Sequence, residues 1–148
     1  MQSISSFTIR CASFLYEHIL LYFILLALNI TFSVLLMDLI YSIPTAEGAI
    51  ESFKLLTGYY FGNSEGFWKT IFLSSLNGII WIVLSIVPIM LAIAGSEKYN
   101  QWLRITLFIF GFSFVITGLY FIGQALSLFG TLLIICGIIW LFVKVFSQ

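Results

Sequence analysis

The sequence predicts an all-α integral membrane protein with four transmembrane helices, and two observations carry this prediction. Of the 148 residues, 61% are apolar and 8% are charged, against about 45–50% and about 25% in ordinary soluble domains. The few charges also leave long uncharged stretches, the longest being the 39 residues Ile105–Val143. Lipid is the solvent in which so much apolar surface is stable, and helices satisfy their own backbone there.

Residues 1–18 are mixed in polarity. Apolar side chains recur at helical spacing, while serines together with Arg10 and Glu17 occupy the other side. This pattern predicts an amphipathic helix that lies at the membrane interface and leads into the first span.

The first crossing is expected at residues 19–41. The 19 residues Ile19–Met37 carry no charge, which is enough for one span. Asp38 closes this stretch and is expected to be solvated at its edge. Pro44 disfavours continuation of the helix through the residue before it.

Residues 42–68 form the predicted outer loop. An apolar stripe opposite Glu51 and Lys54 indicates a short helix on the membrane surface; the stripe consists of Ala49, Ile50, Phe53 and Leu56. Gly58 is expected to end this helix, and Gly62-Asn63-Ser64 is a turn signal before the next crossing.

The second span is expected at residues 69–95. The 39-residue run that follows would be about 58 Å long as one helix, roughly twice the hydrocarbon thickness of a bilayer. We therefore expect a helical hairpin that turns at Gly123-Gln124, with a third span at 103–122 and a fourth at 125–146.

The basic residues orient this arrangement. Four of them share one side of the predicted topology, Arg10, Lys98, Arg104 and Lys144, and two lie on the other, Lys54 and Lys69. The positive-inside rule then places both termini in the cytoplasm. The four could also bind anionic lipid or an acidic partner, although snorkelling explains them equally well.

Small residues recur at heptad spacing in the last three spans. Close backbone approach at such residues is a main source of attraction between helices in lipid, so they predict packing within one bundle or between protomers. They are Ser74, Gly78 and Ser85, then Gly111 and Gly118, then Gly123, Ser127, Gly130 and Gly137. The thin core of a small four-helix chain favours a homo-oligomer.

Polar residues inside the spans are few. Asn29 with Ser33 lies near the middle of the first span, and Asn77 lies in the second. They are expected to form hydrogen bonds between helices, or alternatively to line a path for a solute or an ion.

Catalytic and metal-binding patterns are absent from the sequence. No nucleophile–base set, phosphate-binding glycine loop, metal motif or Cys-x-x-Cys occurs. We therefore expect no enzyme activity, cofactor or metal, and the net charge of zero argues against direct binding of nucleic acid.

In length, span number and scarcity of extramembrane mass, the chain resembles colicin immunity proteins and small membrane subunits of bacterial anti-phage systems such as Kiwa. This resemblance is one of topology and rests on no motif. Small multidrug transporters are similar in span number, but their defining glutamate lies within the first span, whereas here that span has only Asn29 and Glu17 precedes it. Microsomal glutathione transferases are similar in length but need charged residues that this chain lacks.

The resemblance implies a multi-pass protein of the bacterial inner membrane that oligomerises. Such a subunit would sense an event at the envelope, anchor a cytosolic effector, or do both, with membrane lipids and a cytosolic protein as partners. The alternative is a small channel or transporter, based on Asn29, Ser33 and Asn77.

Overall fold

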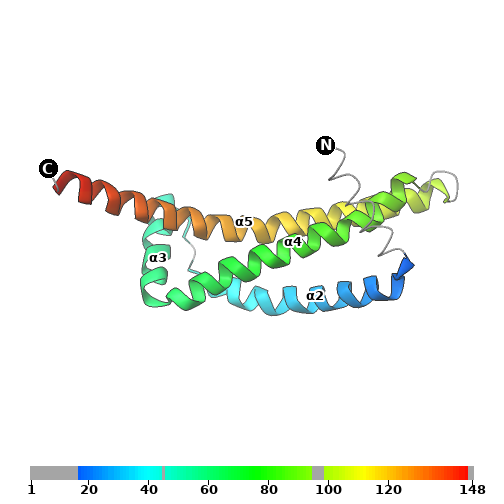
Figure 1. The fold of residues 1–148 in the computed structure, drawn as a ribbon, viewed down its shortest axis with the longest axis horizontal. Helices are drawn as coiled ribbons and strands as arrows, with labels where there is room; N and C mark the ends of the chain where they lie inside the picture. Colours follow the sequence, from blue (N-terminus) through cyan, green and yellow to red (C-terminus); the bar gives the residue numbers. More distant parts are fainter. Residues whose placement is uncertain (1–16, 45, 95–98, 147–148) are drawn as a thin grey trace.

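A computed structural model describes residues 17–44, 46–94 and 99–146 of the chain, and these residues form four helices (Figure 1). In chain order the helices are α2 (Ile19–Tyr41), α3 (Ala49–Gly62), α4 (Ser64–Ala94) and α5 (Gln101–Phe146). The predicted all-helical class is confirmed. Three of the helices, α2, α4 and α5, are long and apolar enough to cross a membrane, which supports a membrane protein.

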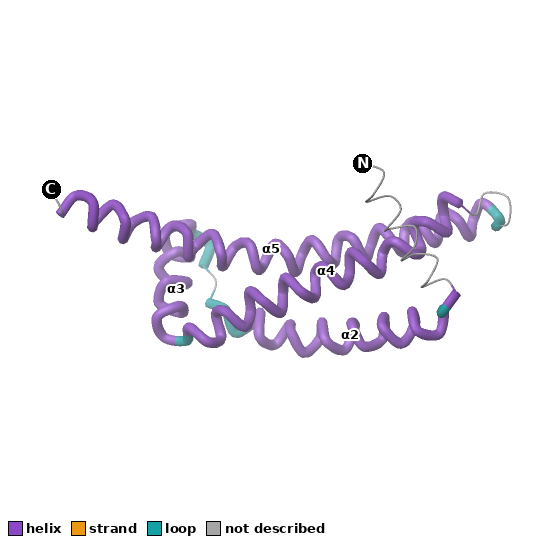
Figure 2. Tube along the Cα trace, viewed as in Figure 1, coloured by secondary structure: helices purple, strands orange, loops and turns teal. Residues whose placement is uncertain are grey.

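The three long helices lie side by side, with α4 between α2 and α5 (Figure 1). α2 and α5 run in one direction and α4 runs in the other, while α3 crosses one end of the bundle (Figure 2). The core follows the two faces of α4, where Trp81 and Leu84 are buried together with Leu36 from α2 and Phe121 from α5. The outward faces of all three long helices are apolar and exposed.

The predicted hairpin at Gly123-Gln124 is wrong, because α5 is one helix of 46 residues that passes through both positions. The expected spans 103–122 and 125–146 are therefore parts of one element. Neither residue breaks a helix. Glutamine is a good helix former, and glycine destabilises a helix by only about 1 kcal/mol relative to alanine. Packing outweighs that cost, because Phe121, Ala125 and Leu128, on both sides of the predicted turn, are buried.

With one helix in place of two, the ends of the described chain separate. The start of α2 and the end of α5 lie at opposite ends of the bundle (Figure 1), so the prediction that both termini share one side is wrong for these ends. Lys144 accordingly lies at the end opposite Arg104. The expected orientation depended on an excess of basic residues on one side of the membrane. That excess included Lys144, so it disappears when Lys144 lies on the other side. The predicted amphipathic lead lies almost wholly outside the described residues.

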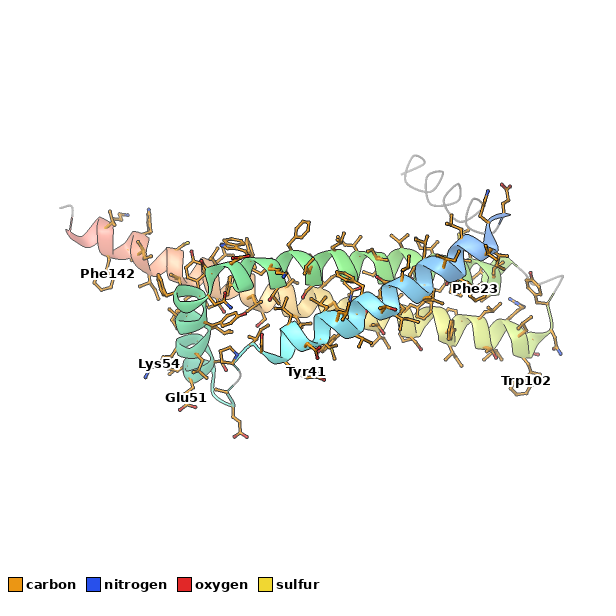
Figure 3. All side chains as sticks on the ribbon, turned by 90° about the horizontal axis from the view of Figure 1, so that it is seen from below. Phe23, Tyr41, Glu51, Lys54, Trp102 and Phe142 are labelled. Carbon is orange, nitrogen blue, oxygen red and sulfur yellow. The ribbon has the colours of Figure 1, made fainter. Side chains whose placement is uncertain are left out.

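A helix does lie in the loop between the first two spans, as expected, but its end differs from the prediction. α3 continues through Gly58 to Gly62, because Tyr60 beyond Gly58 packs edge-on against Phe67 of α4, with ring centroids 5.1 Å apart. Packing again outweighs the helix cost of a glycine. Figure 3 shows Glu51 and Lys54 on the side of α3 that points away from the bundle.

The expected turn at residues 62–64 is confirmed, with Asn63 alone between α3 and α4. The Asn63 side-chain oxygen accepts a hydrogen bond from the Gly66 N–H at 3.0 Å, which is the geometry of a helix N-cap. α4 therefore begins at Ser64, five residues earlier than the predicted start of the second span.

Candidate functional site

A polar cluster is buried between α2 and α4 at the middle of their contact. The Ser33 hydroxyl oxygen lies 3.0 Å from Asn77 Nδ2 and 2.8 Å from Trp81 Nε1, and both N–H groups donate to it. The same hydroxyl donates to the backbone carbonyl of Asn29 at 2.8 Å. A hydroxyl has one donor and two acceptor sites, so Ser33 uses its whole capacity here.

Two further polar side chains in this region are buried without a partner. Asn29 Nδ2 and Ser74 Oγ have no hydrogen-bond partner among the residues that the structure describes, and their side chains are 4% and 0% exposed. Leaving such a group unsatisfied costs about 1–3 kcal/mol. Of the three residues predicted from the sequence, Ser33 and Asn77 are thus joined through their side chains, whereas Asn29 takes part only through its backbone carbonyl.

A second polar link joins the same two helices nearer the start of α2. The Tyr22 hydroxyl donates to the Leu84 carbonyl at 3.0 Å. That carbonyl would normally accept the N–H of residue 88, but residue 88 is a proline and has none. Sequence reasoning missed Tyr22. The signal that would have found it is Pro88 inside an apolar span, since neighbouring helices satisfy the carbonyl that such a proline frees.

The contact between α4 and α5 is built on glycines. A Cβ atom added at Gly78 would lie 2.7 Å from the Gly118 carbonyl oxygen, and one added at Gly118 would lie 2.8 Å from that of Gly78. Likewise, a Cβ at Gly111 would lie 2.6 Å from the Ile89 side chain. Only glycine allows this approach of the two backbones. Ser85 is also buried, and its hydroxyl donates to the Ile82 carbonyl within α4.

The remaining small residues of α5 lie elsewhere. At 100° per residue, Gly123, Ser127, Gly130 and Gly137 share the face opposite to the one that packs on α4. A Cβ at any of the three glycines would meet nothing within 4 Å, and Ser127 is exposed. We call these four residues the outward stripe.

Of the four basic residues predicted to form one rim, the two that the structure describes, Arg104 and Lys144, are not brought together. Arg104 is half-buried, and its Nε donates to the Ala92 carbonyl at 2.8 Å, which satisfies a backbone group near the C-terminus of α4. Lys144 lies about 60 Å away along α5, with its Nζ 5.0 Å from the centre of the Trp140 ring. Arg10 and Lys98 lie outside the described residues.

All side chains of the cluster are neutral, so it has no acid–base pair for proton transfer. Its hydrogen bonds join α2 to α4 specifically in an apolar medium. No protein-family model, curated protein or solved structure matches this chain.

Proposed function

We propose that this chain is a non-catalytic membrane subunit that assembles with copies of itself through α5. The observation that carries the proposal is the outward stripe, which the monomer leaves uncovered. Glycines at positions 123, 130 and 137 repeat every seven residues, the spacing at which helices pack with a left-handed crossing. Small residues at such an interface allow close backbone approach in lipid.

The length of α5 supports the same conclusion. At 1.5 Å per residue its 46 residues extend about 69 Å. A helix tilted by about 40° holds only about 26 residues in a hydrocarbon core of about 30 Å. Roughly a third of the 39-residue uncharged run therefore extends beyond the hydrocarbon unless protein covers it.

The excess length lies at the C-terminal end of α5, beyond α3 and the start of α4 (Figure 1). Among the residues whose burial the structure describes, Ile135 is the last buried one, and every residue from Cys136 to Lys144 is exposed. Figure 3 shows Phe142 on this projecting segment, away from the other helices. An exposed apolar surface of this extent is typical of an interaction site.

A second copy fits this surface better than an unrelated protein. The outward stripe and the projecting segment carry no charge up to Val143, so copies of α5 would not repel one another. A symmetric oligomer also needs only one self-complementary surface. Such an assembly in the bacterial inner membrane would anchor a cytosolic effector or respond to an event at the envelope, possibilities taken from the topological resemblance to anti-phage subunits.

Cross-linking through Cys136 tests the assembly. This thiol is free and exposed and is next to Gly137, so in a Cys11→Ser background a bismaleimide should link two chains in lipid vesicles. Gly130→Ile should abolish the link, while Ile139→Ala, on the opposite side of α5 from Gly130, should preserve it. A Gly130→Ile protein that cross-links like the parent would refute the proposal.

A second candidate function is a small channel or transporter. The burial of Asn29, Ser33 and Asn77 within the apolar helices favours it, because polar residues inside transmembrane segments often line paths for solutes or ions. If this function is correct, Asn29→Leu and Asn77→Leu should each abolish flux in liposomes that contain the purified protein. If vesicles that contain the parent chain remain impermeable to ions and small solutes, the channel or transporter function is excluded.

A further inference from the structure

A groove of about 520 Å³ lies between α2 and α4 at the end of the bundle that α3 crosses. Its apolar walls include Leu36 and Leu39 from α2 and Leu73 from α4. Its polar lining comes from Asp38 and Ser42 of the α2 end and from Lys69 near the start of α4. The groove is distinct from the polar cluster and from the outward stripe.

Polarity changes along this groove. α2 runs toward α3 and α4 runs away from it, so Asp38, Ser42 and Lys69 gather at the end near α3, where Tyr41 is seen in Figure 3. Leu36 and Leu73 lie further toward the middle of the bundle. A groove that is apolar toward the membrane centre and charged at its edge has the amphipathic profile of a phospholipid, with acyl chains below and a headgroup above.

The two charges define the headgroup. Asp38 and Lys69 are both exposed, and neither takes part in an ion pair among the residues that the structure describes. The Lys69 ammonium attracts an anionic phosphate, and the Asp38 carboxylate attracts a cationic group. A headgroup that carries both charges therefore satisfies both residues, whereas an anionic lipid without an amine leaves the Asp38 carboxylate without a partner.

Hydrogen bonding selects among zwitterionic headgroups. The Ser42 hydroxyl donates to the Leu39 carbonyl at 2.6 Å, so its oxygen is left to act as an acceptor. The Asp38 carboxylate is also an acceptor. A primary ammonium has three N–H donors for them, whereas a quaternary ammonium has none.

We propose that this groove binds one phospholipid with a primary ammonium headgroup, its phosphate on Lys69 and its ammonium on Asp38 and Ser42. The site selects phosphatidylethanolamine over phosphatidylcholine through donated hydrogen bonds, and over phosphatidylglycerol through the Asp38 charge. This inference does not depend on self-association, because no residue of the groove belongs to the outward stripe.

The test is native mass spectrometry of the full chain released from nanodiscs that contain phosphatidylethanolamine, phosphatidylcholine and phosphatidylglycerol with identical acyl chains. The bound phosphatidylethanolamine should exceed phosphatidylglycerol by about five-fold, the effect of one interfacial charge, and should also exceed phosphatidylcholine, which cannot donate hydrogen bonds to Asp38 and Ser42. Asp38→Asn should remove this preference. Glu65→Gln, which neutralises an exposed acid of α4 outside the groove, should leave it unchanged.

A second pair of variants examines the phosphate contact. Lys69→Met should lower the retention of phosphatidylethanolamine and phosphatidylcholine alike, and Lys54→Met on α3 should lower neither. Circular dichroism and gel filtration establish that each variant is folded. Equal retention of the three lipids by the parent chain, or an unchanged preference in folded Asp38→Asn, would overturn the assignment and leave only ordinary surrounding lipid.

Discussion

Tyr22 of α2 satisfies the backbone that Pro88 leaves open in α4. Its hydroxyl donates at 3.0 Å to the Leu84 carbonyl, one turn before the proline. Inside a bilayer no water replaces a missing donor, and an unsatisfied carbonyl is expensive. Pro88 can therefore stay within a continuous helix of 31 residues, and the same bond fixes α2 against α4.

Tyr22→Phe should lower the free energy of unfolding by about 1–3 kcal/mol, because it leaves the Leu84 carbonyl without a hydrogen-bond donor. The measurement is equilibrium unfolding in mixed micelles. Tyr120→Phe, at an exposed position of α5, is the matched control and should change little. In a Pro88→Ala background the helix recovers an N–H for Leu84, so the cost of Tyr22→Phe should shrink; equal costs in both backgrounds would contradict this coupling.

Ser33→Ala should destabilise the protein more than Ser85→Ala, although both serines are buried. The Ser33 hydroxyl accepts from Asn77 and Trp81, and removing it leaves two donors unsatisfied at about 1–3 kcal/mol each. The Ser85 hydroxyl bonds only within its own helix, and its loss should cost about 0.6 kcal/mol or less. The same unfolding assay compares them, and a reversed order would mean that the cluster does not fasten α2.

Gly118→Val should disrupt the bundle, whereas Gly130→Val should leave the monomer fold intact. A Cβ at Gly118 meets the Gly78 carbonyl oxygen at 2.8 Å, and a Cβ at Gly130 meets nothing within 4 Å. Backbone atoms cannot move aside cheaply, so α4 and α5 must separate in the first variant. Thermal unfolding in detergent, where the monomer is the reference, distinguishes the two; similar midpoints would place the helix contact elsewhere.

Cysteine labelling in sealed vesicles tests the continuity of α5. Single cysteines at positions 101 and 144 should react with a membrane-impermeant maleimide from opposite sides, because the two positions lie at opposite ends of one helix. A cysteine at position 124 should be protected from both sides. Labelling of 101 and 144 from the same side, with 124 reactive from the other, would restore a hairpin.

Local chemistry was enough to predict several features. The uncharged runs predicted the long apolar helices, and the pattern around Glu51 and Lys54 predicted the helix that became α3. The turn at residues 62–64 was visible because asparagine next to glycine favours an interruption of the helix. The neutral polar residues Asn29, Ser33 and Asn77 could be selected by type, since polar side chains in apolar helices seek one another.

The continuity of α5, the arrangement of its ends and the partners of the polar side chains were decided by tertiary structure alone. At Gly123-Gln124 local preference differs by only about 1 kcal/mol between helix and turn, a gap that burial of Phe121, Ala125 and Leu128 easily exceeds. Likewise, nothing near Tyr22 in the chain indicates Leu84, 62 residues away. The sequence by itself determined which segments are helical and apolar; packing between helices determined where one of them failed to turn and which surfaces remained uncovered.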